Sequence, residues 1–474
     1  MKNLVSLIFA LFVVTACTKS ENGISVENAD TSQHTADFPQ RAKDMTIYEV
    51  NIRQHTPEGT FKSFQEHLPR LSELGADILW IMPIQPIGEK NRKGSLGSYY
   101  SIRDYKSVNP EFGTLDDFKA LVSKAHETGL LVILDWVPNH TAWDHTWITE
   151  HPEYYMTASE AKIVGKELGV DADYYKKKGM GELVYEADWD DIALLNHFNP
   201  ATRAAMIDAM RFWVTETDID GFRTDHAGHE IPMYFWEEVS SALNPLKDLF
   251  WLAEWDEPRM HLVFDATYEW GLLGLTEAVA KGNASAEDLH EHIQKDIARF
   301  GMHPFRLNMI TNHDRNAWEG TIRERYGDGG KAFAVFSFTA YGAPVIYSGQ
   351  EVGLNKRLKF FEKDTISWED PDKYFPFYQK LNQLKVDNPA LWNGGYGGMP
   401  EKLEDGNKDV FSFRRTKDQN TVIGIINMSG ENQTVRLSQK ELSGQYIEAF
   451  TGQSQSLGEI KMSPWAYMIF TKQQ

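Results

Sequence analysis

The sequence has little cysteine and little positive charge for its 474 residues. Its single cysteine, Cys17, excludes a disulfide bond within the chain. Lysine and arginine number 48 against 68 aspartates and glutamates, which gives a formal net charge of -20. Nucleic acid and anionic membrane surfaces are bound through clustered basic residues, so this balance disfavours both as partners. An uncharged partner is compatible with it.

Near its N-terminus the sequence lacks an apolar run long enough to span a bilayer. Residues 4–14 are largely apolar and follow Lys2, the pattern of a signal peptide, here residues 1–16. "VTAC" resembles the cleavage box of bacterial lipoproteins, in which the cysteine is lipidated and becomes the mature N-terminus. We therefore expect an exported lipoprotein at the cell envelope, on the periplasmic or surface face of the outer membrane. Its Cys17 would carry the lipid, its only contact with the membrane, and residues 17–44 would form a flexible tether. The alternative is an incidental cysteine beside an ordinary cleavage site.

Strand-like and helix-like segments alternate from Met45 onward. Most of the strand-like segments are apolar and rich in β-branched residues, as in parallel strands buried on both faces. Helix starts are marked by Thr114 and by the pair Asn199 and Pro200. Eight alternations predict a (β/α)8 TIM barrel over residues 45–393. The eight strand-like segments are residues 46–52, 76–84, 130–137, 220–225, 249–255, 262–268, 306–312 and 343–349.

Two further regions depart from this alternation. The third and fourth strands are separated by more chain than one helix needs, so we expect an inserted subdomain after strand 3 at about residues 139–188. The Gly-rich stretch "GGYGGMP" is followed by short strand-like runs with turn signals between them. Residues 394–474 are therefore predicted to form a C-terminal antiparallel β-domain, a β-sandwich.

Three carboxylates stand at the ends of three different predicted strands: Asp225, Glu254 and Asp314. A single acid of this kind is most often an ion pair or a helix cap, but the carboxyl ends of barrel strands meet at one active-site mouth. Cleavage of a glycosidic bond needs one protonated and one ionised carboxyl group. Arg223 shares a strand face with Asp225 and favours its charged form, whereas the aromatic neighbours of Glu254 favour its protonated form. Asp135, on the third strand, is expected to support the site by holding Arg223 or a neighbouring residue.

"LDWVPNH", "GFRTDHAGH", "LAEW" and "TNHD" resemble, in order, the four signature regions of the α-amylase superfamily, glycoside hydrolase family 13. The resemblance extends over about residues 45–465 and implies the same barrel, insertion and C-terminal β-domain. It also implies a retaining, double-displacement mechanism with Asp225 as nucleophile, Glu254 as acid/base and Asp314 as transition-state stabiliser. The residues it places around the substrate are Tyr100 (with Tyr99 as the alternative), His140, Arg223, His229 and His313.

The sequence departs from the family pattern at three positions. Gly228 replaces a lysine common just before His229, which puts contacts on the leaving-group side in doubt, and His226 follows the nucleophile where smaller residues are usual. Leu194 stands where the family often has a calcium-ligating aspartate. Asn139 matches another calcium ligand, so a structural calcium ion is possible but poorly supported, with His229 carbonyl and Asp188, Asp190 or Asp191 as further donors. No cofactor is expected for the chemistry.

The resemblance predicts a glycosidase that acts on α-1,4-linked glucans, starch-like or glycogen-like, and on maltooligosaccharides. Three alternatives stay open because of these departures. The first is an exo-acting or oligosaccharide-specific α-glucosidase, maltogenic enzyme or transglycosylase of the same superfamily. The second is a catalytically silent surface glycan-binding protein and the third a structural subunit, and the intact carboxylates argue against both. We expect a monomer.

Overall fold

The computed structural model describes residues 38–168, 175–177, 183–186, 189–437 and 442–472. The predicted signal peptide, Cys17 and most of the predicted tether lie outside these residues. The first described residues form helix α1 (Phe38–Arg41), in which Phe38 is fully buried and packs against Phe250 with ring centroids 5.3 Å apart. The tether therefore ends before residue 44. The sequence does not reveal this, because a single short apolar contact leaves no periodic pattern. No helix in the described part of the chain is long and apolar enough to cross a membrane.

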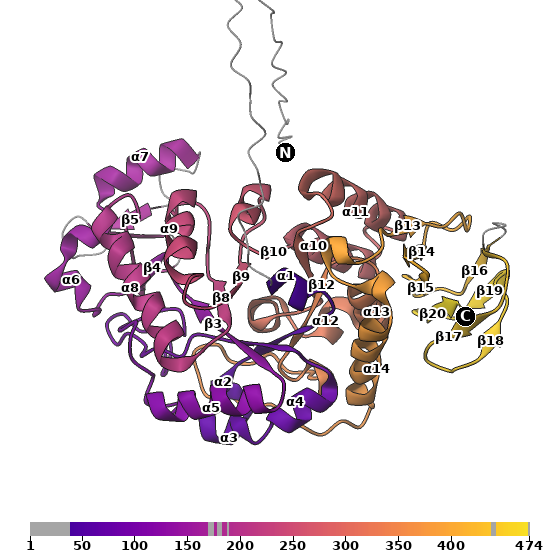
Figure 1. The fold of residues 1–474 in the computed structure, drawn as a ribbon, viewed down its shortest axis with the longest axis horizontal. Helices are drawn as coiled ribbons and strands as arrows, with labels where there is room; N and C mark the ends of the chain where they lie inside the picture. The colour runs from indigo at the N-terminus through magenta and orange to yellow at the C-terminus, as the bar shows by residue number, and fades with distance from the viewer. Residues whose placement is uncertain (1–37, 169–174, 178–182, 187–188, 438–441, 473–474) are drawn as a thin grey trace, which may run out of the picture. The chain divides into compact units, whose positions relative to one another are not determined.

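Eight parallel strands close into a barrel in the order β1-β12-β11-β10-β9-β8-β3-β2, which confirms the predicted fold (Figure 1). Each strand lies within one of the eight segments predicted from the sequence, apart from a one-residue extension of β11. The strands are β1 (Ile47–Val50), β2 (Ile78–Ile81), β3 (Leu131–Trp136), β8 (Gly221–Thr224), β9 (Phe250–Ala253), β10 (Ala266–Tyr268), β11 (Phe305–Asn308) and β12 (Ala343–Tyr347).

Alternation along each strand divides the barrel residues between two environments. Residues such as Ile78 and Ile133 belong to a buried cluster of the barrel interior, while their neighbours Leu79 and Val132 belong to the main core outside the barrel. Two residues further along the interior side of strand β3, Ile133 is followed by Asp135. The interior thus changes from apolar to polar toward the carboxyl ends of the strands, where the site lies.

Helices surround the barrel, and two of them begin as the sequence predicts. The Thr114 side chain accepts from the Asp117 amide at the start of α5, and Asn199 accepts from the Ala201 amide at the start of α8. Pro200 occupies the first position of α8. The barrel helices are α2 (Ile52–His55), α3 (Phe61–Gln65), α4 (Leu68–Leu74), α5 (Leu115–Glu127), α8 (Pro200–Thr217), α9 (Met233–Leu243), α10 (Trp270–Ala280), α11 (Ala286–Phe300), α12 (Ile322–Tyr326), α13 (Gly330–Thr339) and α14 (Tyr374–Asp387).

The insertion after β3 is longer than the sequence predicts. Its first strand pairs antiparallel with its last, so that His140 faces Leu194, and the insertion ends at Leu194 rather than at about residue 188. A strand that depends on a partner some fifty residues away leaves no local signal of its own. The elements are β4 (His140–Ala142), α6 (Trp147–Glu150), α7 (Ala158–Leu168), β5 (Tyr175–Lys177), β6 (Val184–Glu186) and β7 (Ile192–Leu194).

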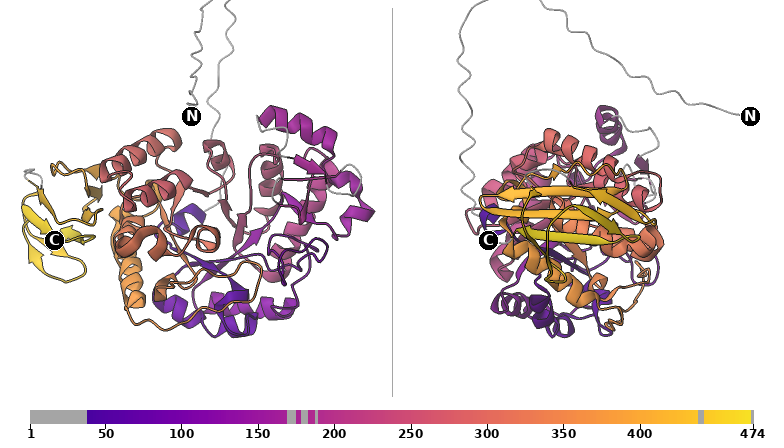
Figure 2. Two further views of the ribbon diagram at one scale, coloured as in Figure 1. Left: turned by 180° about the vertical axis from the view of Figure 1, so that it is seen from behind. Right: turned by 90° about the vertical axis from the view of Figure 1, so that its right-hand side faces the viewer.

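The C-terminal domain is antiparallel, as predicted, and Figure 2 (right) shows its main sheet in orange and yellow. Six strands follow the order β13-β14-β15-β20-β17-β18, and β16 and β19 form a separate pair. The strands are β13 (Glu401–Lys402), β14 (Val410–Lys417), β15 (Asn420–Asn427), β16 (Gln433–Arg436), β17 (Tyr446–Glu448), β18 (Ser454–Gln455), β19 (Glu459–Met462) and β20 (Tyr467–Lys472).

The main sheet of this domain buries both of its faces. Ile423 of β15 belongs to a core shared with Ile460 of the β16–β19 pair. Val422, its neighbour in sequence, belongs instead to the main core of the barrel. On that side Phe411 meets Phe336 of α13 with ring centroids 4.9 Å apart. The domain therefore shares its packing with a barrel helix.

Candidate active site

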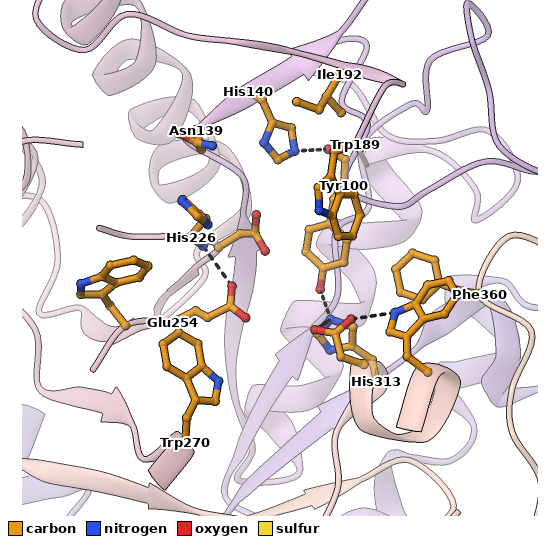
Figure 3. A pocket seen from close by; sticks show the side chains of 14 residues that line it. Tyr100, Asn139, His140, Trp189, Ile192, His226, Glu254, Trp270, His313 and Phe360 are labelled. Carbon is orange, nitrogen blue, oxygen red and sulfur yellow. Dashed lines mark hydrogen bonds and ion pairs between the residues drawn. The ribbon is translucent and has the colours of Figure 1, made fainter. Parts of the chain in front are cut away.

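A cavity of about 300 Å³ opens at the carboxyl ends of the barrel strands (Figure 3). It contains the three carboxylates predicted from the sequence, Asp225, Glu254 and Asp314. The other residues that line it are Tyr100, Asn139, His140, Trp189, Ile192, His226, Trp255, Trp270, His313, Trp318 and Phe360.

Strand register brings Asp225 and Glu254 together. Strands β8 and β9 are neighbours in which Thr224 pairs with Ala253, and each carboxylate follows directly in sequence. The Glu254 amide donates to the Thr224 carbonyl at 3.0 Å, which continues the ladder into the site. The His226 amide donates to Oε2 of Glu254 at 3.0 Å. The main chain after one carboxylate thus orients the other.

Arg223 lies beneath the cavity rather than in its wall. Its side chain is fully buried, and Nη1 donates to Oδ1 of Asp135 and to Oδ1 of Asp225, both at 2.9 Å. Nη2 lies 2.8 Å from Oε2 of Glu254. The predicted contact between Asp135 and Arg223 is confirmed, and Trp80 Nε1 holds the other Asp135 oxygen at 2.9 Å. Arg223 therefore acts through the carboxylates it binds.

Burial and neighbouring charges shift the pKa values of Glu254 and Asp225. Burial raises the pKa of Glu254 to about 7, with Arg223 opposing the shift and the negative charges of Asp225 and Asp314 adding to it. Burial also raises the pKa of Asp225, but Arg223 and His226 act in the opposite direction. Arg223 lowers the pKa of Asp225, as predicted, but the upward effect of burial is larger. Glu254 holds its proton to neutral pH, as a general acid requires.

Asp314 is held in its charged form by His313. Burial alone would raise the Asp314 pKa, but His313, whose Nε2 lies 3.3 Å from Oδ2, keeps it below its usual value. The His313 pKa is well above normal, because burial is outweighed by Asp314 and by Glu49, whose Oε1 contacts Nδ1. Glu49 lies on β1 and was not among the predicted site residues. Asp314 thus presents a negative charge to the cavity.

Tyr100, rather than Tyr99, faces the cavity. Its hydroxyl lies 2.9 Å from Nε2 of His313 and 3.1 Å from Oδ2 of Asp135, and its ring stacks on His313 at 5.4 Å. Tyr99 is buried elsewhere, with the Arg53 guanidinium 4.2 Å from its ring centroid. His140 Nε2 lies 3.1 Å from the Tyr100 carbonyl oxygen. Of the predicted substrate contacts, Tyr100, His140 and His313 therefore lie in the cavity wall.

The segment after the nucleophile has an unusual backbone. His226 and His229 adopt positive φ angles of 44° and 49°, and the His229 ring packs on Trp255 with centroids 4.6 Å apart, outside the cavity lining. A Cβ atom on Gly228 would lie 2.1 Å from the Trp255 ring. The indole thus fills the space that the lysine common in the family would need, which gives the Gly228 departure a physical reason.

Five aromatic side chains in the cavity were missed by the sequence prediction. Two had a signal: Trp255 follows Glu254 directly, and Trp318 follows Asp314 by one helical turn in η3 (Arg315–Glu319) and donates to its Oδ1 at 3.2 Å. Trp189 and Phe360 come from separate loops and Trp270 from the start of α10, and nothing in the sequence connects them. Together the aromatic rings give the cavity flat apolar surfaces beside its three carboxylates.

The calcium position expected at Asn139 stays a prediction. Asn139 lines the cavity and Leu194 is fully buried on β7, but Asp191 is bound by Lys93, whose Nζ lies 3.3 Å away. Within the described ranges, two groups of three His, Asp or Glu side chains are close enough to share a metal ion, and Asp191 belongs to neither. A hard cation needs six or more oxygen ligands. Asp188 lies outside the described residues.

Known proteins resemble this chain in sequence and in fold. Residues 26–239, which include Asp225, match the family described as alpha amylase, catalytic domain. Alpha-amylase MalA of Haloarcula japonica is 27% identical over 85% of this chain, which spans 58% of that protein. A cyclomaltodextrinase of a Bacillus species is 27% identical over 84% of the chain and 70% of the relative.

A solved structure shares almost the whole described architecture. It is that of a noncanonic maltogenic alpha-amylase, AmyB, from Thermotoga neapolitana, with a TM-score of 0.79 and 26% identity over 90% of this chain and 98% of that one. The barrel, its carboxylate cluster and these similarities define a glycosidase. Over residues 26–239 the chain is similar to the alpha-amylase catalytic domain of the glycoside hydrolase family 13 superfamily.

Proposed function

We propose that the protein is a retaining glycoside hydrolase that cleaves α-1,4-glucosidic bonds in starch-like or glycogen-like α-glucans and in maltooligosaccharides. One observation carries the proposal: Asp225 and Glu254 share the Arg223 guanidinium and face one aromatic-lined cavity, and Glu254 has a pKa of about 7. The relatives named as amylases and as a cyclomaltodextrinase support the choice of substrate.

The chemistry follows the two displacements of a retaining glycosidase. The Asp225 carboxylate attacks the anomeric carbon while the Glu254 carboxyl gives its proton to the departing glycosidic oxygen, leaving a glycosyl ester on Asp225. Glu254, now a carboxylate, takes a proton from water as that water attacks the same carbon and releases Asp225. The charge on Asp314 stabilises the positive character that develops on the sugar ring in both steps. No cofactor takes part.

The test is hydrolysis of starch and of short maltooligosaccharides, followed by chromatography of the products. The wild-type chain is expected to release a ladder of mid-sized products. Asp225→Asn and Glu254→Gln are each expected to lower kcat by more than about 10³-fold. Asp328→Asn changes an exposed carboxylate outside the cavity and serves as the matched control. If Asp225→Asn retained more than a few percent of the activity, the nucleophile assignment would be wrong.

A second candidate is a maltogenic or oligosaccharide-specific enzyme of the same superfamily, including a transglycosylase. The Trp255 ring against Gly228 favours it, because the indole fills the space of a lysine that the family commonly has at this position. The fold similarity to a maltogenic alpha-amylase supports it too. Maltose or glucose as the only early product would select this candidate over endo-hydrolysis. Binding of α-glucans without any turnover would instead favour a silent glycan-binding protein.

We also propose that Cys17 is lipidated and anchors a monomeric enzyme at the cell envelope. The proposal rests on the "VTAC" box after a short apolar run. Expressed in a bacterium that processes lipoproteins, the wild-type chain should fractionate with membranes and carry an acylated N-terminus by mass spectrometry. Cys17→Ser should release it into the soluble fraction. Wild-type protein without acyl chains would contradict the proposal.

A further inference from the structure

Three side chains just after the nucleophile form a cluster that the proposed hydrolysis does not use. They are His226, His229 and Glu230, and one ligand atom of each lies within 4.8 Å of the others. We propose that this cluster is a binding site for a zinc-like divalent cation at the edge of the active-site cavity. The proposal concerns side chains only and is distinct from the calcium position predicted at Asn139.

The backbone between the nucleophile and α9 is folded so that these side chains converge. His226 has φ of 44° and His229 has φ of 49°, values in the left-handed region that non-glycine residues seldom adopt. Such conformations cost on the order of 1–3 kcal/mol each and persist where the surroundings impose them. Two left-handed residues turn the chain tightly enough to place positions 226, 229 and 230 on one side. These strained conformations therefore place the imidazoles of His226 and His229 beside the Glu230 carboxylate.

Packing against Trp255 holds both imidazole rings. The indole lies edge-on to them, with ring centroids 4.6 Å from His229 and 5.5 Å from His226. The two imidazole centroids are 5.4 Å apart at 76°. Gly228, between the two histidines, allows the indole to approach this closely. Rings fixed from outside are ligands that lose little freedom when a metal ion binds.

Glu230 supplies the negative charge of the cluster from a fully buried position. Its Oε1 accepts a hydrogen bond from the Tyr175 hydroxyl, and its Oε2 lies 3.3 Å from Nε2 of His226. A buried carboxylate needs a compensating positive charge. A divalent cation bound to Glu230 would supply one. The Tyr175 hydrogen bond then acts as the outer contact that orients a metal-bound carboxylate.

The ligand set indicates the kind of cation. Two imidazoles and one carboxylate are typical ligands of Zn²⁺, and three protein ligands leave a fourth tetrahedral position for water. Calcium needs six to eight oxygen ligands, which this cluster does not offer. Ions of the zinc class are therefore expected to bind here in preference to calcium.

Binding at this cluster would connect two parts of the cavity wall. His226 lines the cavity beside Asp225, whereas Tyr175 belongs to β5 of the insertion. A cation on His226, His229 and Glu230 would fix this loop and, through Tyr175, tie it to the insertion. The site would thus stabilise the wall without taking part in bond cleavage.

Calorimetric titration of the full, chelator-treated chain with ZnCl₂ and with CaCl₂ tests the proposal. We expect one Zn²⁺ per chain, bound at least about tenfold more tightly than Ca²⁺. His229→Asn and Glu230→Gln should each weaken Zn²⁺ binding by about tenfold or more. His151→Asn removes an exposed histidine outside the cluster and should leave it unchanged.

A spectroscopic measurement on the wild-type chain covers the case in which a variant does not fold. Co²⁺ bound to two nitrogens and two oxygens in tetrahedral geometry gives a visible absorption band, and Zn²⁺ should displace it in equimolar amount. Zn²⁺ should also raise the Tm of the wild-type chain and shift it less in folded His226→Asn. No Zn²⁺ binding by the wild type, or unchanged affinity in the folded variants, would overturn the proposal.

Discussion

Nη2 of Arg223 lies 2.8 Å from Oε2 of Glu254, although Glu254 is the group expected to carry a proton. The contact lowers the Glu254 pKa against the larger upward effect of burial, and the balance is a value of about 7. Arg223 therefore lowers the pH up to which Glu254 keeps its proton.

Weakening this contact should change the pH profile as well as the rate. In Arg223→Lys an ammonium group replaces the planar guanidinium group, and it cannot bind Asp135, Asp225 and Glu254 together. We expect kcat/KM to fall by about 10²-fold. The basic limb of the kcat/KM profile, set in the wild type by Glu254 near pH 7, should move to higher pH, because a contact that lowers its pKa is lost. Arg436→Lys, at an exposed arginine on β16, is the control. A limb that moved to lower pH would contradict this account.

The Glu254 pKa also predicts a pH dependence of stability. The folded protein keeps this proton to about pH 7, whereas the unfolded chain loses it near 4.5. Between these values the folded state binds more protons, so its stability falls as pH rises. Glu254→Gln removes this loss. The Tm of the variant relative to wild type should therefore increase from pH 4.5 to pH 8, by the equivalent of at most about 3 kcal/mol. Equal differences at both pH values would show that the Glu254 pKa is ordinary.

Trp318 combines two roles that two substitutions can separate. Its indole donates to Oδ1 of Asp314 at 3.2 Å, and its ring, 48% exposed, lies 5.1 Å from that of Phe360. Trp318→Phe keeps an aromatic surface and loses the hydrogen bond, so kcat should fall about threefold to tenfold with KM little changed. Trp318→Ala should raise KM in addition. Tyr234→Ala, which removes an exposed aromatic ring that does not line the cavity, is the control. Steady-state kinetics of the three variants compare their kcat and KM values. Equal KM in both Trp318 variants would rule out a binding role for the ring.

Gly228 should tolerate no side chain while Trp255 is present. A Cβ atom there would lie 2.1 Å from the indole, so Gly228→Ala is expected to lower the free energy of unfolding by about 1–3 kcal/mol. In a Trp255→Ala background the same change should cost little, which denaturant titration of the four proteins in a double-mutant cycle measures. Gly274→Ala, at a glycine of α10 with open space around it, is the control. Additive effects would mean that the two residues do not compete for space.

The parts of the site that local sequence predicts are those tied to strand ends. Apolar, β-branched runs locate the strands, and the carboxyl ends of parallel strands meet, so the sequence predicts that Asp225, Glu254 and Asp314 lie together. The expected support of the site by Asp135, at another strand end, is present as its contact with Arg223. Hydrogen bonds between adjacent parallel strands make such neighbours predictable.

The parts that were missed depend on contacts between distant loops. Trp189 comes from the insertion, Trp270 from the start of α10 and Phe360 from the loop after β12, and their meeting in one cavity has no local pattern. Glu49 looks in sequence like one polar residue in an apolar strand, and only the structure shows its contact with His313. The end of the insertion was placed too early for the same reason, since β7 exists through its pairing with β4.

The two-sided burial of the C-terminal sheet has a consequence for any shortened version of this protein. Phe411 and Val422 complete packing that α13 begins, and Arg415 donates from Nη1 to the Thr339 carbonyl at the end of that helix, at 3.2 Å. Removing residues 394–474 would expose the apolar side of α13 to water. A chain cut there should form aggregates rather than a smaller working enzyme, and heating the intact chain should melt barrel and sheet in one cooperative step.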